Sequence, residues 1–154
     1  MTQKVKSNGP RRRKITPAGS AEMEALEGLC RQIIVEVGET PEREGLVKPP
    51  RRMAHALRYL THGYRQDPAQ IIGDAIFRED THEMVLVRNI ELYSLCEHHF
   101  LPFFGKAHLG YVPDGRIIGL SKVARLIEVF SRRLQVQERL TQQIADCLME
   151  HLKP

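Results

Sequence analysis

Apolar residues that recur three and four positions apart predict a helix beginning at Ser20. They are Met23, Leu26, Leu29, Cys30, Ile33, Ile34 and Val37. Gly38 follows the last of them and can end this helix. Thr40 and Pro41 then open a short helical turn, and "KPP" separates it from a second helix that runs through Met53, Leu57 and Leu60 and ends near Gly63. Residues 20–65 are therefore expected to form an N-terminal helical region with Cys30 in its core.

The pattern then changes to that of strands. "EMVLVRNIELYSL" (83–95) and "GKAHLGYVP" (105–113) are rich in β-branched and aromatic residues with partial alternation, which predicts an antiparallel pair joined by "CEHHFLPFF" (96–104). Helical spacing returns in two further segments. Their apolar positions are Leu120, Val123, Ala124, Ile127 and Phe130, then Val136, Leu140, Ile144, Cys147 and Leu148. Residues 66–154 are therefore expected to form an α+β domain.

Length and cysteine content agree with a single soluble domain. The chain has 154 residues, 42% of them hydrophobic, and lacks both an apolar run of the ~20 residues that span a bilayer and the apolar centre of a signal peptide. We expect a cytoplasmic protein without membrane association. The three cysteines, Cys30, Cys96 and Cys147, are odd in number and widely spaced. Disulfides are therefore not expected, and Cys96 is available as a ligand or nucleophile.

The positive net charge is concentrated in the N-terminal tail. Residues 1–20 hold six of the 23 basic residues and no acidic one, so 17 basic and 19 acidic residues remain in the body. We expect residues 1–19 to be a basic, disordered tail. It reads either as a solubilising extension or as an arm for RNA or an acidic partner. Because no aromatic residues are interleaved with the charges, nucleic-acid binding is the less favoured reading.

The stretch "CEHH" suggests a metal site. Cys96 and His99 would face opposite sides of a regular strand, so they can converge on one ion only if the backbone turns between them. A thiolate and an imidazole make half of a tetrahedral zinc site, and His98 could serve as an acid or base beside a zinc-bound water. The spacing alone leaves a chance arrangement equally open, because such a site needs a third ligand.

A second group of residues suggests an anion site. Ser121 is expected to be the N-cap of the helix after Gly119, with Lys122 and Arg125 in its first turn. Cations there oppose the helix dipole, which a bound phosphate would explain, although cations extending into solvent would also fit. Glu138 lies off the apolar face of its helix, where it is either a solvated glutamate or a carboxylate that accepts the paired N–H donors of a guanine.

The order and spacing of three segments resemble GTP cyclohydrolase type I. They are "ETPEREGLVKPPRRMAHALRYLTHGY", "SLCEHHFLPFFGKAHLGYVP" and "IIGLSKVARLIEVFSRRLQVQERLTQQIA", and the resemblance runs from about residue 20 to residue 154. It implies the tunnelling fold (T-fold), an antiparallel sheet with helices packed on it that follows N-terminal helices. It also implies that the chain ends before the family's last two strands, which carry a second catalytic histidine and a cysteine that is the third zinc ligand.

The resemblance also assigns roles. Cys96 and His99 would bind Zn²⁺ and His98 would transfer protons at the guanine imidazole ring; Ser121, Lys122 and Arg125 would hold the triphosphate, and Glu138, assisted by Gln137, the guanine. The implied reaction is attack of zinc-activated water on C8 of GTP, loss of formate and closure to 7,8-dihydroneopterin triphosphate, the first step of tetrahydrofolate synthesis.

The implied assembly is a toroidal homodecamer with active sites at subunit boundaries. Two readings remain. The chain is either a cyclohydrolase that completes its ligand set elsewhere, for instance through Cys147 or His151, or an inactive GTP-binding or regulatory module that associates with full-length subunits.

Overall fold

The computed structural model describes residues 19–73 and 75–154. The predicted basic tail, apart from Gly19, lies outside the described residues. None of the helices in the described ranges is long and apolar enough to cross a membrane.

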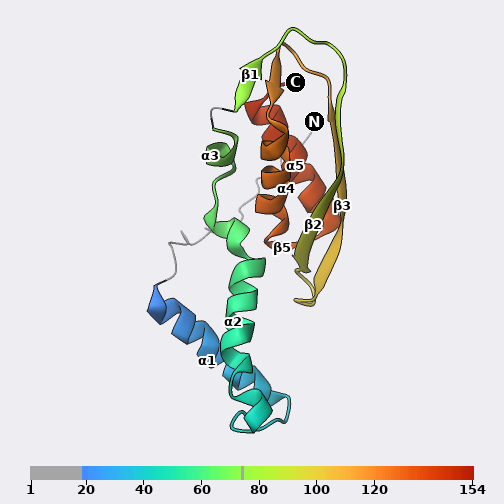
Figure 1. The fold of residues 1–154 in the computed structure, drawn as a ribbon. Helices are drawn as coiled ribbons and strands as arrows, with labels where there is room; N and C mark the ends of the chain where they lie inside the picture. The colour runs from blue at the N-terminus through green and yellow to red at the C-terminus, as the bar shows by residue number, and fades with distance from the viewer. Residues whose placement is uncertain (1–18, 74) are drawn as a thin grey trace, which may run out of the picture.

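The N-terminal helical region is present as predicted. Helix α1 (Ser20–Glu36) is followed by the 3-10 helix η1 (Glu44–Leu46), helix α2 (Pro49–Leu60), the 3-10 helix η2 (His62–Arg65) and the short helix α3 (Pro68–Ile72). Gly38, after the end of α1, has a φ of 92°, the left-handed conformation that glycine adopts without strain. Helices α1 and α2 pack on each other and extend away from the sheet (Figure 1). We call this helix pair the arm.

The arm buries only part of its apolar surface. Cys30 of α1 and Ala54 of α2 are fully buried, which confirms the prediction that Cys30 lies in a core. Leu29, Ile33 and Val37 belong to the same predicted apolar stripe but are exposed. A two-helix pair covers one side of each helix, so the rest of the stripe faces outward.

The predicted antiparallel pair forms the main sheet. Strand β2 (Val85–Cys96) pairs with β3 (Pro102–Tyr111), with a bulge between Val87 and Ile90. Three short strands were not predicted. Strand β5 (Leu134–Gln135) pairs in parallel with the end of β2, giving the order β3-β2-β5, and β1 (Ile76–Arg78) pairs with β4 (Arg116–Ile118) in a separate two-stranded sheet.

Helices α4 (Leu120–Ser131) and α5 (Gln137–His151) cover one face of the main sheet (Figure 1). Their apolar faces meet the inward side chains of β3 in one core that includes Leu109, Tyr111, Ile127 and Leu148. This arrangement of N-terminal helices, a mixed sheet and packed helices is the α+β fold expected from the sequence.

The arm joins the rest of the molecule at the C-terminal end of α4. Gly63 in η2 donates its N–H to the carbonyl of Arg132 at 3.0 Å, and a Cβ at this position would lie 2.0 Å from the Val129 carbonyl oxygen. The Tyr64 hydroxyl accepts the Leu134 N–H at 3.0 Å. Only glycine permits this approach of two backbones, so residue 63 fixes where the arm attaches.

Candidate active site

The candidate metal residues lie at the tip of the β2–β3 hairpin, where the backbone reverses. Strand β2 ends at Cys96, and the Phe100 N–H donates to the Cys96 carbonyl at 2.9 Å. The Cys96 N–H in turn donates to the Leu101 carbonyl at 2.8 Å, and Phe100 has a φ of 58°. The turn that a shared metal ion requires between Cys96 and His99 is therefore present.

The turn brings the thiol close to both imidazoles. Cys96 Sγ lies 3.5 Å from His99 Nδ1 and 3.9 Å from His98 Nδ1. Zinc bonds of ~2.3 Å to sulfur and ~2.0 Å to nitrogen at a tetrahedral angle place the two donor atoms about 3.6 Å apart. Cys96 and His99 therefore fit two corners of a tetrahedral zinc site, while the His98 side chain is 64% exposed and free to meet a ligand.

The described residues supply only this part of a ligand set. Within residues 19–73 and 75–154, no group of three or more His, Cys, Asp or Glu side chains is arranged to hold a metal ion. Cys147 and His151 lie together near the C-terminal end of α5, with Sγ and Nδ1 3.8 Å apart. That position is ~15 Å along the helix from Gln137, so neither residue completes the site at the hairpin tip of the same chain.

Glu97 connects the hairpin tip to α5. The two terminal nitrogens of Arg139 donate to the two oxygens of the Glu97 carboxylate, and the Glu97 N–H donates to the Gln135 carbonyl at 3.1 Å. The hydrogen bonds from Arg139 hold the pKa of the Glu97 carboxyl below its usual value, against the smaller opposing effect of desolvation. The same pairing raises the pKa of Arg139.

The two candidate guanine residues stand beside this connection. Gln137 begins α5 and Glu138 lies in its first turn, and both are exposed. Glu138 also interacts favourably with the helix dipole at that position, so the solvated-glutamate reading of this residue remains open. The ion pair of Arg139 places the first turn of α5 next to the loop that carries Cys96, His98 and His99.

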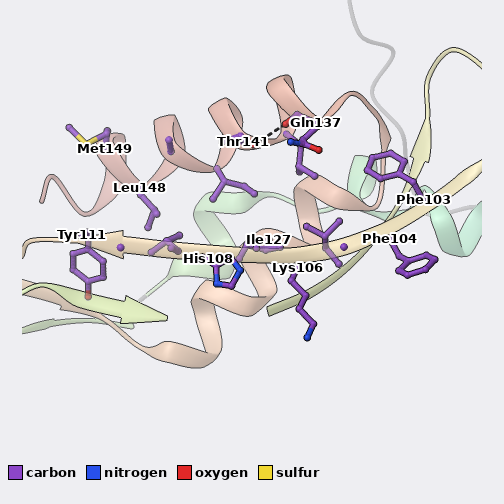
Figure 2. A pocket seen from close by; sticks show the side chains of 18 of the residues that line it. Phe103, Phe104, Lys106, His108, Tyr111, Ile127, Gln137, Thr141, Leu148 and Met149 are labelled. Atoms are coloured by element: carbon purple, nitrogen blue, oxygen red, sulfur yellow. Dashed lines mark hydrogen bonds between the residues drawn. The ribbon is translucent and has the colours of Figure 1, made fainter. Parts of the chain in front are cut away.

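A groove of about 440 Å³ extends from Gln137 between α5 and β3. Figure 2 shows Gln137 and Phe103 at one end of it and Tyr111 and Met149 at the other. The Thr141 hydroxyl donates to the Gln137 carbonyl at 2.9 Å, which orders this turn of the helix. Gln137 is therefore at the rim of an apolar groove that lies along an edge strand of the sheet.

The prediction for Ser121 as helix N-cap was wrong. Gly119 is the N-cap of α4, and Ser121 is the second residue of the helix, with no side-chain capping hydrogen bond. Lys122 remains in the first turn, but Arg125 lies in the second. The helix starts two residues earlier because the Gly119 N–H bonds to the Ala75 carbonyl at 3.0 Å, which ends the β4 segment at that point.

The structure does not bring the candidate anion residues to the hairpin tip of the same chain. Strand β5 follows α4 and pairs with the end of β2, so the C-terminal end of α4 lies at the tip. Ser121 is ten residues before Ser131, which corresponds to ~15 Å along the helix. Figure 1 shows the beginning of α4 near β1, at the other end of the sheet.

Sequence reasoning missed Glu97, Gln135 and Arg139 as parts of this site. Glu97 lies inside the "CEHH" motif, so its position gave a signal, but its partner is 42 residues away in the sequence. No local pattern connects residues so far apart; only the pairing of β5 with β2 does.

The fold and the site define an α+β protein in which a thiol and an imidazole, those of Cys96 and His99, lie at a separation that fits two zinc ligands. Comparison with known sequences specifies it further: the sequence model of GTP cyclohydrolase I matches residues 26–154. The chain therefore belongs to the GTP cyclohydrolase I family.

Individual relatives agree with this assignment. The chain is 58% identical over 132 residues to GTP cyclohydrolase 1 of Chlorobium phaeovibrioides, covering 86% of this chain and 59% of the relative. It is 64% identical over 118 residues to GTP cyclohydrolase 1 of Chlorobaculum tepidum, covering 77% and 53%. For the protein of the same name in Dictyostelium discoideum, identity is 52% over 132 residues, covering 86% and 57%. The chain thus spans little more than half the length of these curated relatives.

Proposed function

We propose that this chain supplies part of a zinc-dependent active site that opens the imidazole ring of GTP, giving formate and 7,8-dihydroneopterin triphosphate. The observation that carries the proposal is the 3.5 Å approach of Cys96 Sγ to His99 Nδ1 beside the first turn of α5. A thiolate and an imidazole at that separation fit zinc, and family membership supports GTP as the substrate.

Each residue has a role that its position supports. Cys96 and His99 would hold zinc, which when bound supplies a Lewis acid that lowers the pKa of water toward ~7. His98, exposed beside them, moves protons at the guanine imidazole ring. The Glu138 carboxylate accepts the two N–H donors at the guanine edge, with Gln137 beside it.

The triphosphate would be held by Ser121, Lys122 and Arg125. Cationic side chains and free amides at the start of α4 suit a polyphosphate. These residues lie roughly 9–15 Å along α4 from the hairpin tip, which supports the arrangement implied by the resemblance, with sites at boundaries between copies of the chain.

Self-association is part of the proposal. Strand β3 is an edge of the described sheet, and Phe104 on it is 81% exposed. The arm also leaves apolar side chains uncovered. Such surfaces favour a homo-oligomer, for which light scattering after gel filtration gives the mass directly.

Pterin formation from GTP tests the proposal. The purified chain is incubated with GTP and Zn²⁺, and product is detected by fluorescence after oxidation. We expect product that disappears in Cys96→Ala and His98→Ala but persists in His82→Ala, whose side chain is exposed and remote from the tip. Absence of product from folded wild-type chain would contradict cyclohydrolase activity in this form.

A second function is favoured by one observation, the lack of a third ligand among the described residues. In that case the chain is an inactive GTP-binding or regulatory module that joins full-length subunits. It would bind GTP without turnover, and would change the activity of a full-length relative when mixed with it. Turnover by the chain alone would contradict this second function.

A further inference from the structure

Among the described residues, Glu97 links the loop with the candidate metal residues to α5 and to the strand just before it. The hydrogen bonds of Cys96 and Phe100 within the hairpin shape the loop itself but do not reach α5. Glu97 makes two contacts outside the hairpin: its N–H donates to the Gln135 carbonyl in β5, just before α5, and its carboxylate accepts from Arg139 in α5. The position of Cys96 and His99 relative to Glu138 therefore depends on these contacts.

Gln135 and Arg139, the two hydrogen-bonding partners of Glu97, are themselves held in place by their surroundings. The Gln135 side chain is 1% exposed, and its amide nitrogen donates to the Phe130 carbonyl and to Gln143 Oε1, both at 2.8 Å. Arg139 projects from the first turn of α5, one residue after Glu138. Its planar guanidinium engages both carboxylate oxygens, a geometry that fixes orientation as well as distance.

The ion pair is partly exposed, so solvent screens it and limits its effect on folding stability. The Glu97 and Arg139 side chains are 28% and 45% exposed, and pairs at such positions contribute little to folding free energy. The Glu97 carboxylate also lies 3.9 Å from His98 Nε2, so it sits between the hairpin histidines and α5. We therefore expect Glu97 to act mainly on the position of the hairpin loop relative to α5.

We propose that Glu97 and Arg139 are positioning residues that hold the Cys96–His99 loop at a fixed distance from Gln137 and Glu138. This inference deepens the proposed function and rests on it for its consequence, which is coupling between metal and guanine binding. A metal held by the loop and the Glu138 carboxylate can contact the same guanine ring only while the two segments keep their spacing.

The first measurement needs neither metal nor nucleotide. Amide hydrogen exchange is followed in peptides covering residues 95–101, in wild type and in Glu97→Gln, Arg139→Gln and Arg139→Lys. Exchange at the loop should rise about tenfold in all three variants while the urea midpoint stays unchanged, because opening is local. Arg139→Lys keeps the charge but loses the two-point geometry, so it separates geometry from charge. Arg43→Gln, which breaks an exposed ion pair with Glu39 on the arm, is the matched control and should leave loop exchange unchanged.

The second measurement reports on function. The GTP affinity of the full chain is measured by calorimetry with and without Zn²⁺. In wild type, Zn²⁺ should strengthen GTP binding; in Arg139→Lys that enhancement should fall about tenfold, with Zn²⁺ affinity in the absence of GTP kept. The charge-exchanged double variant E97R/R139E should recover loop protection, because it restores a two-point pair.

The outcomes are distinguishable. Unchanged loop exchange in all three variants would overturn the inference, as would a rise that merely follows a lower urea midpoint. A wild-type chain that binds neither Zn²⁺ nor GTP would overturn the proposed function instead. In that event the exchange data would still decide whether the ion pair holds the loop.

Discussion

The two ends of α4 differ in how their polar side chains are held. At the C-terminal end, Gly63, Leu134, Gln135 and Glu97 are connected by hydrogen bonds between segments far apart in the sequence. At the N-terminal end, the side chains of Ser121, Lys122 and Arg125 make no recorded hydrogen bond or ion pair within the described part of the chain. One end is therefore held by contacts between distant segments, whereas the other presents polar and cationic side chains without such contacts, among them Lys122 in the first turn, where a cation opposes the helix dipole.

The largest expected effect concerns the C-terminal end of α4. Cys96→Ala should reduce the zinc retained after dialysis to background, because the remaining imidazoles lack the thiolate that completes the pair with His99. Metal content is measured by atomic emission. His82→Ala removes an exposed histidine outside the hairpin tip and should keep wild-type zinc content. Equal zinc in wild type and Cys96→Ala would remove the metal assignment.

The attachment of the arm to the same end gives the next effect. Gly63→Ala should lower the free energy of unfolding by about 2–4 kcal/mol, since the added methyl collides with backbone atoms that cannot move aside. Gly28→Ala is the matched control: this helix position in α1 has nothing within 4 Å of the added carbon, so it should stabilise by about 0.5–1 kcal/mol. Urea unfolding measures both, and equal signs would contradict the close approach at Gly63.

The other end of α4 is tested through its ligand. Lys122→Ala or Arg125→Ala should weaken GTP binding roughly 10–100-fold, the range for hydrogen bonds to charged groups. Guanosine binding and zinc content should not change, because neither involves the start of α4. Calorimetry with both ligands makes the comparison. Equal losses for GTP and guanosine would show that these residues do not contact the triphosphate.

The smallest expected effect concerns the two buried thiols, Cys147 and Cys30. Burial of Cys147 in α5 raises the pKa of its thiol. The folded chain thus keeps this thiol neutral at a pH where the unfolded chain, with a thiol pKa of about 8.5, has begun to ionise. The contribution is complete below the unfolded pKa and is lost as pH rises toward the folded value.

Stability should accordingly fall as the pH rises above about 8, where the unfolded thiol begins to ionise, and the fall should be shallower in Cys147→Ala. Burial raises the pKa of Cys30 in the same direction, so Cys30→Ala gives a second, independent reduction of the slope. The slopes are compared rather than the absolute stabilities, because each substitution also changes core packing. An identical slope in wild type and both variants would contradict the burial of the thiols.

The sequence predicted much of the fold because the relevant signals are local. Helices α1, α2, α4 and α5 and the β2–β3 pair were all found from the period of their apolar residues. The short strands β1, β4 and β5 were missed, because two or three residues do not establish a period. Ser121 was placed two residues too early in its helix because the bond from Gly119 to Ala75 sets the start of α4.

For the candidate site, residue types could be predicted from the sequence, but their arrangement could not. The "CEHH" motif identified Cys96, His98 and His99, and the hairpin turn brings Cys96 Sγ and His99 Nδ1 to 3.5 Å; zinc binding by them stays a prediction. The roles of Ser121, Lys122, Arg125, Gln137 and Glu138 remain predictions. Glu97 and Arg139 were recognised as parts of the site only from the hydrogen bonds that join them in the structure.

By itself, the sequence determined the helical arm, the central hairpin, the three buried or half-buried thiols and the chemistry available at the hairpin tip. These depend on propensity and on apolar period, which act over a few residues. Tertiary structure alone decided that the end of β2 meets β5, that Arg139 reaches Glu97 and that Lys122 and Arg125 lie roughly 9–14 Å along α4 from its end at the hairpin. Contacts between distant segments arise from packing a whole core, and no local stretch of sequence contains that information.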